Sequence, residues 1–241
     1  MDQEKFSAKK SAKRSSAKTS EGPKRSKPGA GLEKNKLKAG LYLVATPIGN
    51  LADLSLRGLE ILQNAEVVAC EDTRVTGKML SRHAIDTPMK AYHEHNAERA
   101  RPGLLRIIEA GGVVALVSDA GTPSISDPGY RLVNDCIDQG LEITAAPGAN
   151  AAITGLILSG LPTDRFLFAG FLPSKTSQRS KELAELAAVP ATLIFYESAK
   201  RLAAALTDMV AELGDRSAAV TRELTKLHEE IRRGTLSELA Q

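Results

Sequence analysis

The sequence is poor in cysteine and in aromatic residues, and it has no long apolar run. Its 241 residues include two cysteines, no tryptophan and nine aromatic side chains, which excludes a disulfide-stapled scaffold and makes base-stacking platforms scarce. The apolar runs fall far short of the roughly 18–20 residues of a membrane span, and no secretory leader follows the N-terminal lysines. With 42% apolar and 25% charged residues, this composition predicts a globular, cytoplasmic protein without a membrane segment.

The common nucleotide and hydrolase signatures are also missing. The chain has no G-x-G-x-x-G after its first predicted strand, no G-x-x-x-x-G-K-[ST] and no G-x-S-x-G, which argues against a dinucleotide-binding fold, a P-loop ATPase and an ordinary α/β-hydrolase. His93 and His95 flank Glu94, but no H-E-x-x-H helix is present and neither cysteine is near. Polar residues at a substrate mouth explain this group better than a metal site does.

Charge is divided unevenly along the chain. Residues 1–38 hold 12 Lys/Arg and 4 Asp/Glu, whereas residues 39–241 hold the other 20 Lys/Arg and 25 Asp/Glu. The tail has no apolar periodicity, so we predict that it is disordered. It serves either as a solubilising extension or as a basic arm that binds nucleic acid through counterion release.

From Gly40 onward, short aliphatic runs alternate with helical patterns, which predicts an α/β fold with a mostly parallel sheet. The predicted strands are 41–45, 66–69, 89–92, 113–117 and 142–145, and the predicted helices are one capped by Ser55, then 76–82, 104–109 and 129–139. A second set contains strands 166–169, 192–196, 218–221 and 229–232, with helices 178–187 and 199–213. Gly214 is predicted to end the last of these as a left-handed C-cap.

We predict three segments: a basic tail (1–38), an N-terminal α/β domain (39–162) and a C-terminal α/β domain (163–241). The turn residues at 160–163 mark the boundary between the two domains. A final helical pattern begins after Gly234 and stops at Gln241 with no strand beyond it. An uncapped helix with an uncovered apolar face predicts that the chain is a fragment.

Polar, Gly/Pro-rich loops follow all five strands of the first set. They are residues 46–50, 71–74, 93–96, 118–129 and 147–150. In an open α/β sheet, ligands bind outside the carboxyl ends of the strands. Five such loops together therefore predict a binding crevice at this edge.

Six segments of the chain, in order and with matching spacing, resemble the tetrapyrrole methylase superfamily and within it the ribosomal RNA branch. They are 41–53 (LYLVATPIGNLAD), 71–74 (EDTR), 116–123 (LVSDAGTP), 127–130 (DPGY), 195–198 (FYES) and 222–226 (RELTK). The resemblance runs from about Gly40 to the end of the chain, leaves out the basic tail, and lacks the family's final strand.

This resemblance implies two α/β domains with S-adenosylmethionine in the cleft between them, and a homodimer. It also implies 2′-O-methylation of a cytidine in small-subunit ribosomal RNA, acting on the assembled subunit. The cofactor-binding residues that it implies are Pro47, Asp119, Ala120, Gly121, Thr122, Ile125, Asn150, Ala151, Glu197 and Lys226. Ala149-Asn150 departs from the proline and small residue usual in the family after Pro-Gly, which weakens the assignment of Asn150.

The residue types in these loops suit this cofactor independently of the resemblance. Small residues such as Ala120 and Gly121 let backbone amides approach a zwitterion, and no Lys or Arg within 118–129 repels a sulfonium. Asp119 or Asp127 offers the offsetting charge. The competing interpretations are a turn or cap for Asp119 and, more strongly, a helix cap for Asp127.

Candidate bases for the hydroxyl proton are Glu71, Asp72, His93, Glu94 and His95, of which we favour Asp72 and His95 as catalytic residues. For RNA binding we select Arg74, Lys175 and Arg179, although a salt bridge to Asp72 explains Arg74 equally well. Two rival functions remain open: a small-molecule tetrapyrrole methylase of the same fold, and a non-catalytic factor that binds the ribosomal subunit.

Overall fold

A computed structural model of the protein describes residues 37–241, so the predicted basic tail lies outside the described residues except for its last two positions. The first half of the described chain forms a five-stranded parallel sheet of order β3-β2-β4-β1-β5. Its strands are β1 (Gly40–Val44), β2 (Val67–Cys70), β3 (Met89–Ala91), β4 (Val113–Leu116) and β5 (Ile143–Ala146). β2 and β4 are buried along their whole length, as their unbroken aliphatic sequences predict for strands covered on both faces.

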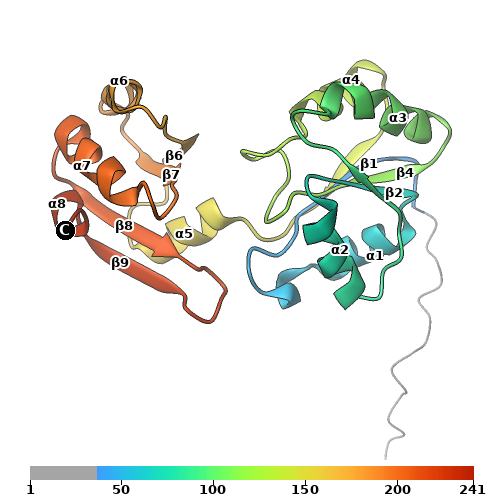
Figure 1. The fold of residues 1–241 in the computed structure, drawn as a ribbon, viewed down its shortest axis with the longest axis horizontal. Coiled ribbons are helices and arrows are strands. Elements are labelled where there is room, and N and C mark those ends of the chain that lie inside the picture. The colour runs from blue at the N-terminus through green and yellow to red at the C-terminus, as the bar shows by residue number, and fades with distance from the viewer. Residues whose placement is uncertain (1–36) are drawn as a thin grey trace, which may run out of the picture. The chain divides into compact units, whose positions relative to one another are not determined.

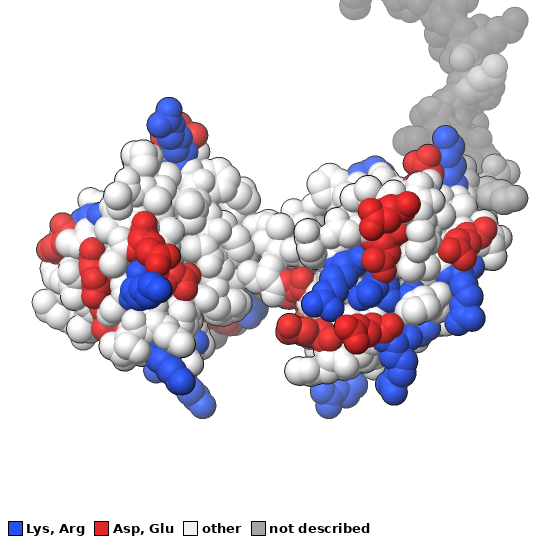
Figure 2. Space-filling model, turned by 90° about the horizontal axis from the view of Figure 1, so that it is seen from above, with Lys and Arg blue, Asp and Glu red and all other residues white. Residues whose placement is uncertain are grey.

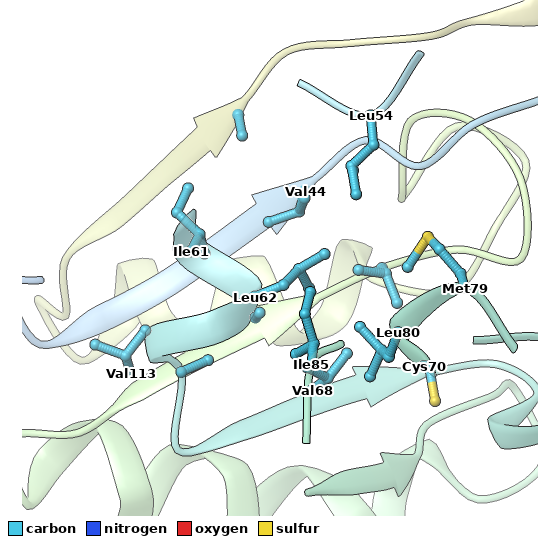
Figure 3. Close-up of a cluster of buried hydrophobic side chains, with 14 residues drawn as sticks. Val44, Leu54, Ile61, Leu62, Val68, Cys70, Met79, Leu80, Ile85 and Val113 are labelled. Carbon is cyan, nitrogen blue, oxygen red and sulfur yellow. The ribbon is translucent and has the colours of Figure 1, made fainter. Parts of the chain in front are cut away.

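Helices cover both faces of this sheet, with α1 and α2 on one side and α3 and α4 on the other (Figure 1). They are α1 (Leu56–Asn64), α2 (Thr73–Arg82), α3 (Ala97–Glu109) and α4 (Tyr130–Asp138), and a 3₁₀ turn (Leu51–Asp53) precedes α1. On the first face, Ile61 and Leu62 of α1 and Met79 and Leu80 of α2 pack with Val68 of the sheet (Figure 3). On the other face, a second cluster joins α3 and α4 to the same strands.

The second half contains two small sheets with their own core. Its elements are α5 (Ala151–Ser159), β6 (Phe166–Phe171), α6 (Thr176–Leu186), β7 (Thr192–Tyr196), α7 (Leu202–Leu213), β8 (Ser217–Arg222), β9 (Glu230–Thr235) and α8 (Leu236–Leu239). Strands β6 and β7 are parallel, whereas β8 and β9 form an antiparallel hairpin. Leu183, Leu206 and Leu236 belong to the third core cluster, so helices α6, α7 and α8 pack together.

Three details differ from the sequence-based expectations. Helix α3 begins at Ala97 rather than Leu104. It therefore continues through Pro102, a residue that usually interrupts a helix because it has no amide hydrogen to donate. Gly214 ends α7 with φ +73° and ψ 166°, so the positive φ is present but the predicted left-handed C-cap is wrong. The last helix carries a capping box between Thr235 and Glu238, and Leu236 is buried, so its apolar face is partly covered within the chain itself.

Helix α5 is the element that the hydrophobic pattern did not reveal. Its sequence, AAITGLILS, is apolar on all sides, so it has no amphipathic period to detect. Although α5 precedes the predicted domain boundary, it packs on β7, β8 and β9. Arg233 of β9 donates hydrogen bonds to the carbonyls of Leu158 and Ser159. These bonds satisfy carbonyl groups at the end of α5.

Candidate functional site

The loops after β1 and β4 are joined at the carboxyl edge of the parallel sheet. Thr46 and Gly121 exchange two backbone hydrogen bonds, of 2.9 and 3.0 Å. The Thr46 hydroxyl donates to the Ser118 carbonyl at 3.1 Å, and the Ser118 hydroxyl donates to the Gly121 carbonyl at 3.0 Å. These bonds hold the loop that contains Pro47 against the 118–129 loop.

Gly121 is suited to this junction because its backbone has φ +86°. A Cβ atom there would lie 3.3 Å from Ile48 Cγ2, so a side chain would press on the first loop. At Gly148, after β5, a Cβ atom would lie 3.0 Å from Ala45 Cβ. The two glycines keep the backbone of neighbouring loops close together.

Two further loops are connected to the loop after β4. The Asp119 carboxylate accepts a hydrogen bond from the Asp72 amide at 3.1 Å, which links it to the loop after β2. The Thr122 hydroxyl donates to the Ala149 carbonyl at 3.1 Å, which links it to the loop after β5. Four of the five predicted loops therefore form one hydrogen-bonded edge.

Helix α5 starts at this edge and presents its N-terminus there. Asn150 is its N-cap, and its side-chain oxygen accepts a hydrogen bond from the Ile153 amide at 3.1 Å. The amide of Ala152 donates to the Tyr196 hydroxyl at 3.2 Å. Because the amides of Ala152 and Ile153 have these partners, the amide of Ala151 is the one left among the described residues of this helix start to favour an anionic group such as a carboxylate.

Carboxylates gather at the ends of β2 and β4. Burial raises the pKa of Asp127 to about 6, and the nearby Glu71 and Asp119 add to the increase while the polar Ser118 side chain opposes it. Burial also raises the pKa of Glu71, and Asp119 contributes in the same direction. The expectation that Asp127 caps a helix is wrong, because the N-cap of α4 is Gly129 and no side chain caps that helix.

The two residues favoured for catalysis have different surroundings. Asp72 caps α2 by accepting from the Arg74 amide at 2.8 Å, and it pairs with the Arg74 guanidinium. Arg74 lowers the pKa of Asp72 to about 2, so this carboxylate is a poor proton acceptor at neutral pH. His95 is exposed, with its ring centroid 6.1 Å from that of His93.

Glu197 and Lys226, the predicted cofactor residues of the second half, both make local ion pairs. The Glu197 side chain is 6% exposed and lies 3.0 Å from Arg201. Lys226 pairs with Glu223 at 3.0 Å in the loop between β8 and β9. A Cβ atom at Gly49 would lie 2.9 Å from Thr225 Oγ1, so the loop after β1 approaches this second loop.

Comparison with known proteins gives this arrangement a family. The model of the family "Tetrapyrrole (Corrin/Porphyrin) Methylases" matches residues 40–240. The chain belongs to the tetrapyrrole methylase family. It is 58% identical over 205 residues to ribosomal RNA small subunit methyltransferase I of Mesorhizobium japonicum, which covers 85% of this chain and 70% of the relative. It is 48% identical over 200 residues to the protein of that name from Escherichia coli O157:H7, which covers 83% of this chain and 70% of that relative.

Two solved structures share the fold of this chain. Diphthine synthase matches with a TM-score of 0.65 at 17% identity, over 83% of each chain. Cobalt precorrin-4 methyltransferase matches with a TM-score of 0.63 at 18% identity, over 88% of this chain and 90% of its own. The comparisons confirm the resemblance and the α/β fold class, and they confirm the predicted activity at the level of a methyltransferase.

The prediction that Arg179 binds RNA is wrong for this member of the tetrapyrrole methylase family. Arg179 is buried: its guanidinium pairs with Asp208 at 2.5 Å and donates to the carbonyls of Pro173 and Ser174. It holds α6 against α7 and is not available to RNA. Lys175 is exposed, and the Arg74 side chain is 86% exposed despite its pair with Asp72.

A hollow of about 200 Å³ lies in the second half, away from the predicted cofactor residues. It is lined by Leu202, Val220, Arg222, Glu230, Arg232 and Leu239. Glu230 accepts hydrogen bonds from both arginines, which lowers its pKa. Within residues 37–241, the structure shows no group of three or more His, Cys, Asp or Glu that is arranged to hold a metal ion, and none of the described helices has the length and hydrophobicity of a membrane span.

Proposed function

We propose that this protein transfers a methyl group from S-adenosylmethionine to the 2′-hydroxyl of a cytidine ribose in small-subunit ribosomal RNA, within the assembled subunit. The relatives carry the name ribosomal RNA small subunit methyltransferase I, which supports this class of substrate. The observation that carries the proposal is the hydrogen-bonded edge formed by Thr46, Asp119 and Gly121. A homodimer is part of the same proposal.

The residues at this edge fit S-adenosylmethionine, which supplies an activated methyl group on a sulfonium when bound. The N-terminus of α5 would hold the carboxylate of its methionine end through backbone amides. Pro47 and residues 119–125 would line the sulfonium region, where the carboxylates of Asp119 and Asp127 offset its charge. Glu197 and Lys226 would hold the adenosine from the second half.

Asp127 is a better proton acceptor for the ribose hydroxyl than Asp72. With a pKa of about 6, its carboxylate is ionised at pH 7–8 and yet is more basic than an ordinary aspartate. Asp72 is fully engaged by Arg74 and has a pKa of about 2. We therefore assign Asp127 the role of accepting the proton of the ribose hydroxyl. We assign Asp72 the role of positioning α2 and Arg74.

Cofactor titration by calorimetry tests the binding half of this proposal. We expect wild type and Arg74→Ala to bind S-adenosylmethionine equally, whereas Asp119→Ala and Gly121→Leu bind it at least tenfold more weakly. Gly121→Leu acts because a side chain at φ +86° presses on Ile48. Equal affinities in all four proteins would contradict the site, and the absence of binding heat in wild type would favour a non-catalytic ribosome-binding factor.

Transfer of a tritiated methyl group tests the substrate. We expect labelling of small ribosomal subunits at a cytidine ribose, and no labelling of a tetrapyrrole precursor. Arg74→Ala is expected to reduce transfer to the subunit while its cofactor affinity stays unchanged. Labelling of the tetrapyrrole alone would establish the small-molecule methylase instead.

A further inference from the structure

Helix α2 carries a row of cations along one face. Arg74, Lys78 and Arg82 are four residues apart, so they lie above one another over about 12 Å of helix. All three are exposed, and the Arg74 side chain is 86% exposed. The helix from Thr73 to Arg82 contains no acidic residue, and Arg74 alone of the three pairs with the N-cap residue Asp72 among the described residues. We call these three residues the α2 ridge.

The α2 ridge does not contribute to the stability of the helix. Like charges four residues apart destabilise a helix by about 0.2–0.5 kcal/mol per pair, and the α2 ridge contains two such pairs. The core packing comes from the opposite face, where Thr76, Met79 and Leu80 are buried. Within residues 37–241 neither Lys78 nor Arg82 has an ion-pair partner.

Helix α3, on the other face of the sheet, shows the ordinary pattern. Arg101 of α3 pairs with Asp135 of α4, and Glu98 of α3 lies 3.6 Å from Arg131 of α4. In the view onto this α3–α4 face, basic and acidic side chains lie side by side (Figure 2). Helix α3 thus includes two acidic residues beside its three arginines, whereas helix α2 includes none.

The α2 ridge begins at the candidate site. Asp72 is the N-cap of α2, and its amide donates to Asp119 in the loop after β4. A partner held along the α2 ridge is thus led to the edge where the cofactor is proposed to bind. The α2 helix has no aromatic residue, so it lacks the anchors typical of a protein interface and offers charge alone.

We propose that the α2 ridge binds the phosphodiester backbone of the substrate RNA and guides it toward the methyl-transfer site. This inference rests on the proposed function and adds to it a surface for the substrate. A nucleic-acid strand in a helix carries one negative charge per about 3.4 Å of its axis, so a 12 Å row faces about three phosphates. Arg74 would contact the phosphate nearest the site, and Lys78 and Arg82 would contact those further away.

The test is the salt dependence of RNA binding by the full chain carrying Lys78→Ala and Arg82→Ala. We measure the affinity for protein-free small-subunit RNA by filter binding across a series of salt concentrations. Loss of two phosphate contacts should reduce the slope of log K against log[salt] by about 1.4–1.8, since each contact contributes about 0.7 in a single strand and about 0.9 in a duplex. Cofactor affinity should match wild type and the thermal midpoint should not fall, since removing the like-charge pairs relieves repulsion, and Lys78→Arg with Arg82→Lys should restore the slope.

The matched control removes the same charge from α3 through Arg99→Ala and Arg106→Ala, both exposed positions. We expect this variant to keep the wild-type slope. An unchanged slope in the α2 variant would overturn the proposal, as would an equal reduction in both variants. Weaker binding to intact subunits with an unchanged slope for free RNA would instead indicate contact with a ribosomal protein. Wild type that binds RNA with the expected slope but transfers no methyl group would contradict the proposed function and leave the α2 ridge in place.

Discussion

At the scale of single residues, two carboxylates at the same sheet edge have opposite pKa shifts because their surroundings differ. Asp72 is next to a guanidinium and a helix N-terminus, which favour its charged form. Asp127 is half-buried near Glu71 and Asp119, and both the burial and the neighbouring charges disfavour ionisation. This contrast separates a carboxylate that positions a helix from one able to accept a proton.

Asp127→Asn tests this assignment through stability and activity together. The folded-state pKa of about 6 lies above the usual 3.8, so the native state binds more protons between these values and stability falls as pH rises through that window. Allowing for solvent screening, ionised Asp127 costs on the order of 1 kcal/mol. We expect Asp127→Asn to melt about 2–4 °C higher at pH 8 and like wild type at pH 4.

Calorimetric melting curves at the two pH values measure this effect, and the exposed substitution Asp86→Asn is the control. The rate of methyl transfer at pH 8 should fall by about 10²–10⁴-fold in Asp127→Asn, with cofactor affinity less affected. A higher melting temperature at both pH values would assign the effect to packing rather than to charge. A near-wild-type rate would exclude Asp127 as the base.

At the scale of elements, two helices of nine residues begin with similar caps in different contexts. Ser55 caps α1 by accepting from the Gly58 amide at 3.0 Å, and Asn150 caps α5 by accepting from the Ile153 amide at 3.1 Å. Only α5 begins beside the loops proposed to hold the cofactor. Substitutions of the two caps therefore distinguish an effect on helix stability from an effect on ligand binding.

We expect Ser55→Ala and Asn150→Ala each to lower the free energy of unfolding by about 1 kcal/mol, since each leaves a helix amide unsatisfied. Only Asn150→Ala should also weaken S-adenosylmethionine binding, because the helix start that holds the carboxylate becomes less ordered. Urea denaturation and calorimetric titration measure the two quantities. An equal loss of cofactor affinity in both variants would show that the effect is global.

At the scale of the whole molecule, a ligand held by loops from both halves should stabilise the fold. At 100 times its Kd, S-adenosylmethionine should add about 2.7 kcal/mol of stability. That increment corresponds to a rise of about 5–10 °C in melting temperature for a chain of this size. Gly121→Leu should show little of this shift at the same concentration. A thermal shift assay with and without cofactor measures it, and an absent shift in wild type would contradict cofactor binding.

Much of the fold was predictable because its signals are local. The strands of the parallel sheet are aliphatic runs bounded by turn residues, and the structure places all five within a residue or two of their predicted positions. Ser55 caps α1 as predicted, because an N-cap depends on one side chain and an amide three residues away. Helix α5 escaped detection because an all-apolar helix has no periodic signal.

The sequence by itself determined the strands of the parallel sheet, the family and the loops that gather at one sheet edge, because spacing and polarity are properties of neighbouring residues. Only the tertiary structure decided what individual charges do. Arg179 and Lys78 are both cations on predicted helices, yet Arg179 is buried against Asp208, whereas Lys78 is exposed and has no ion-pair partner among residues 37–241. The ion-pair partners of a charged side chain come from segments distant in the chain. The role of a charged residue therefore depends on packing that no local sequence pattern encodes.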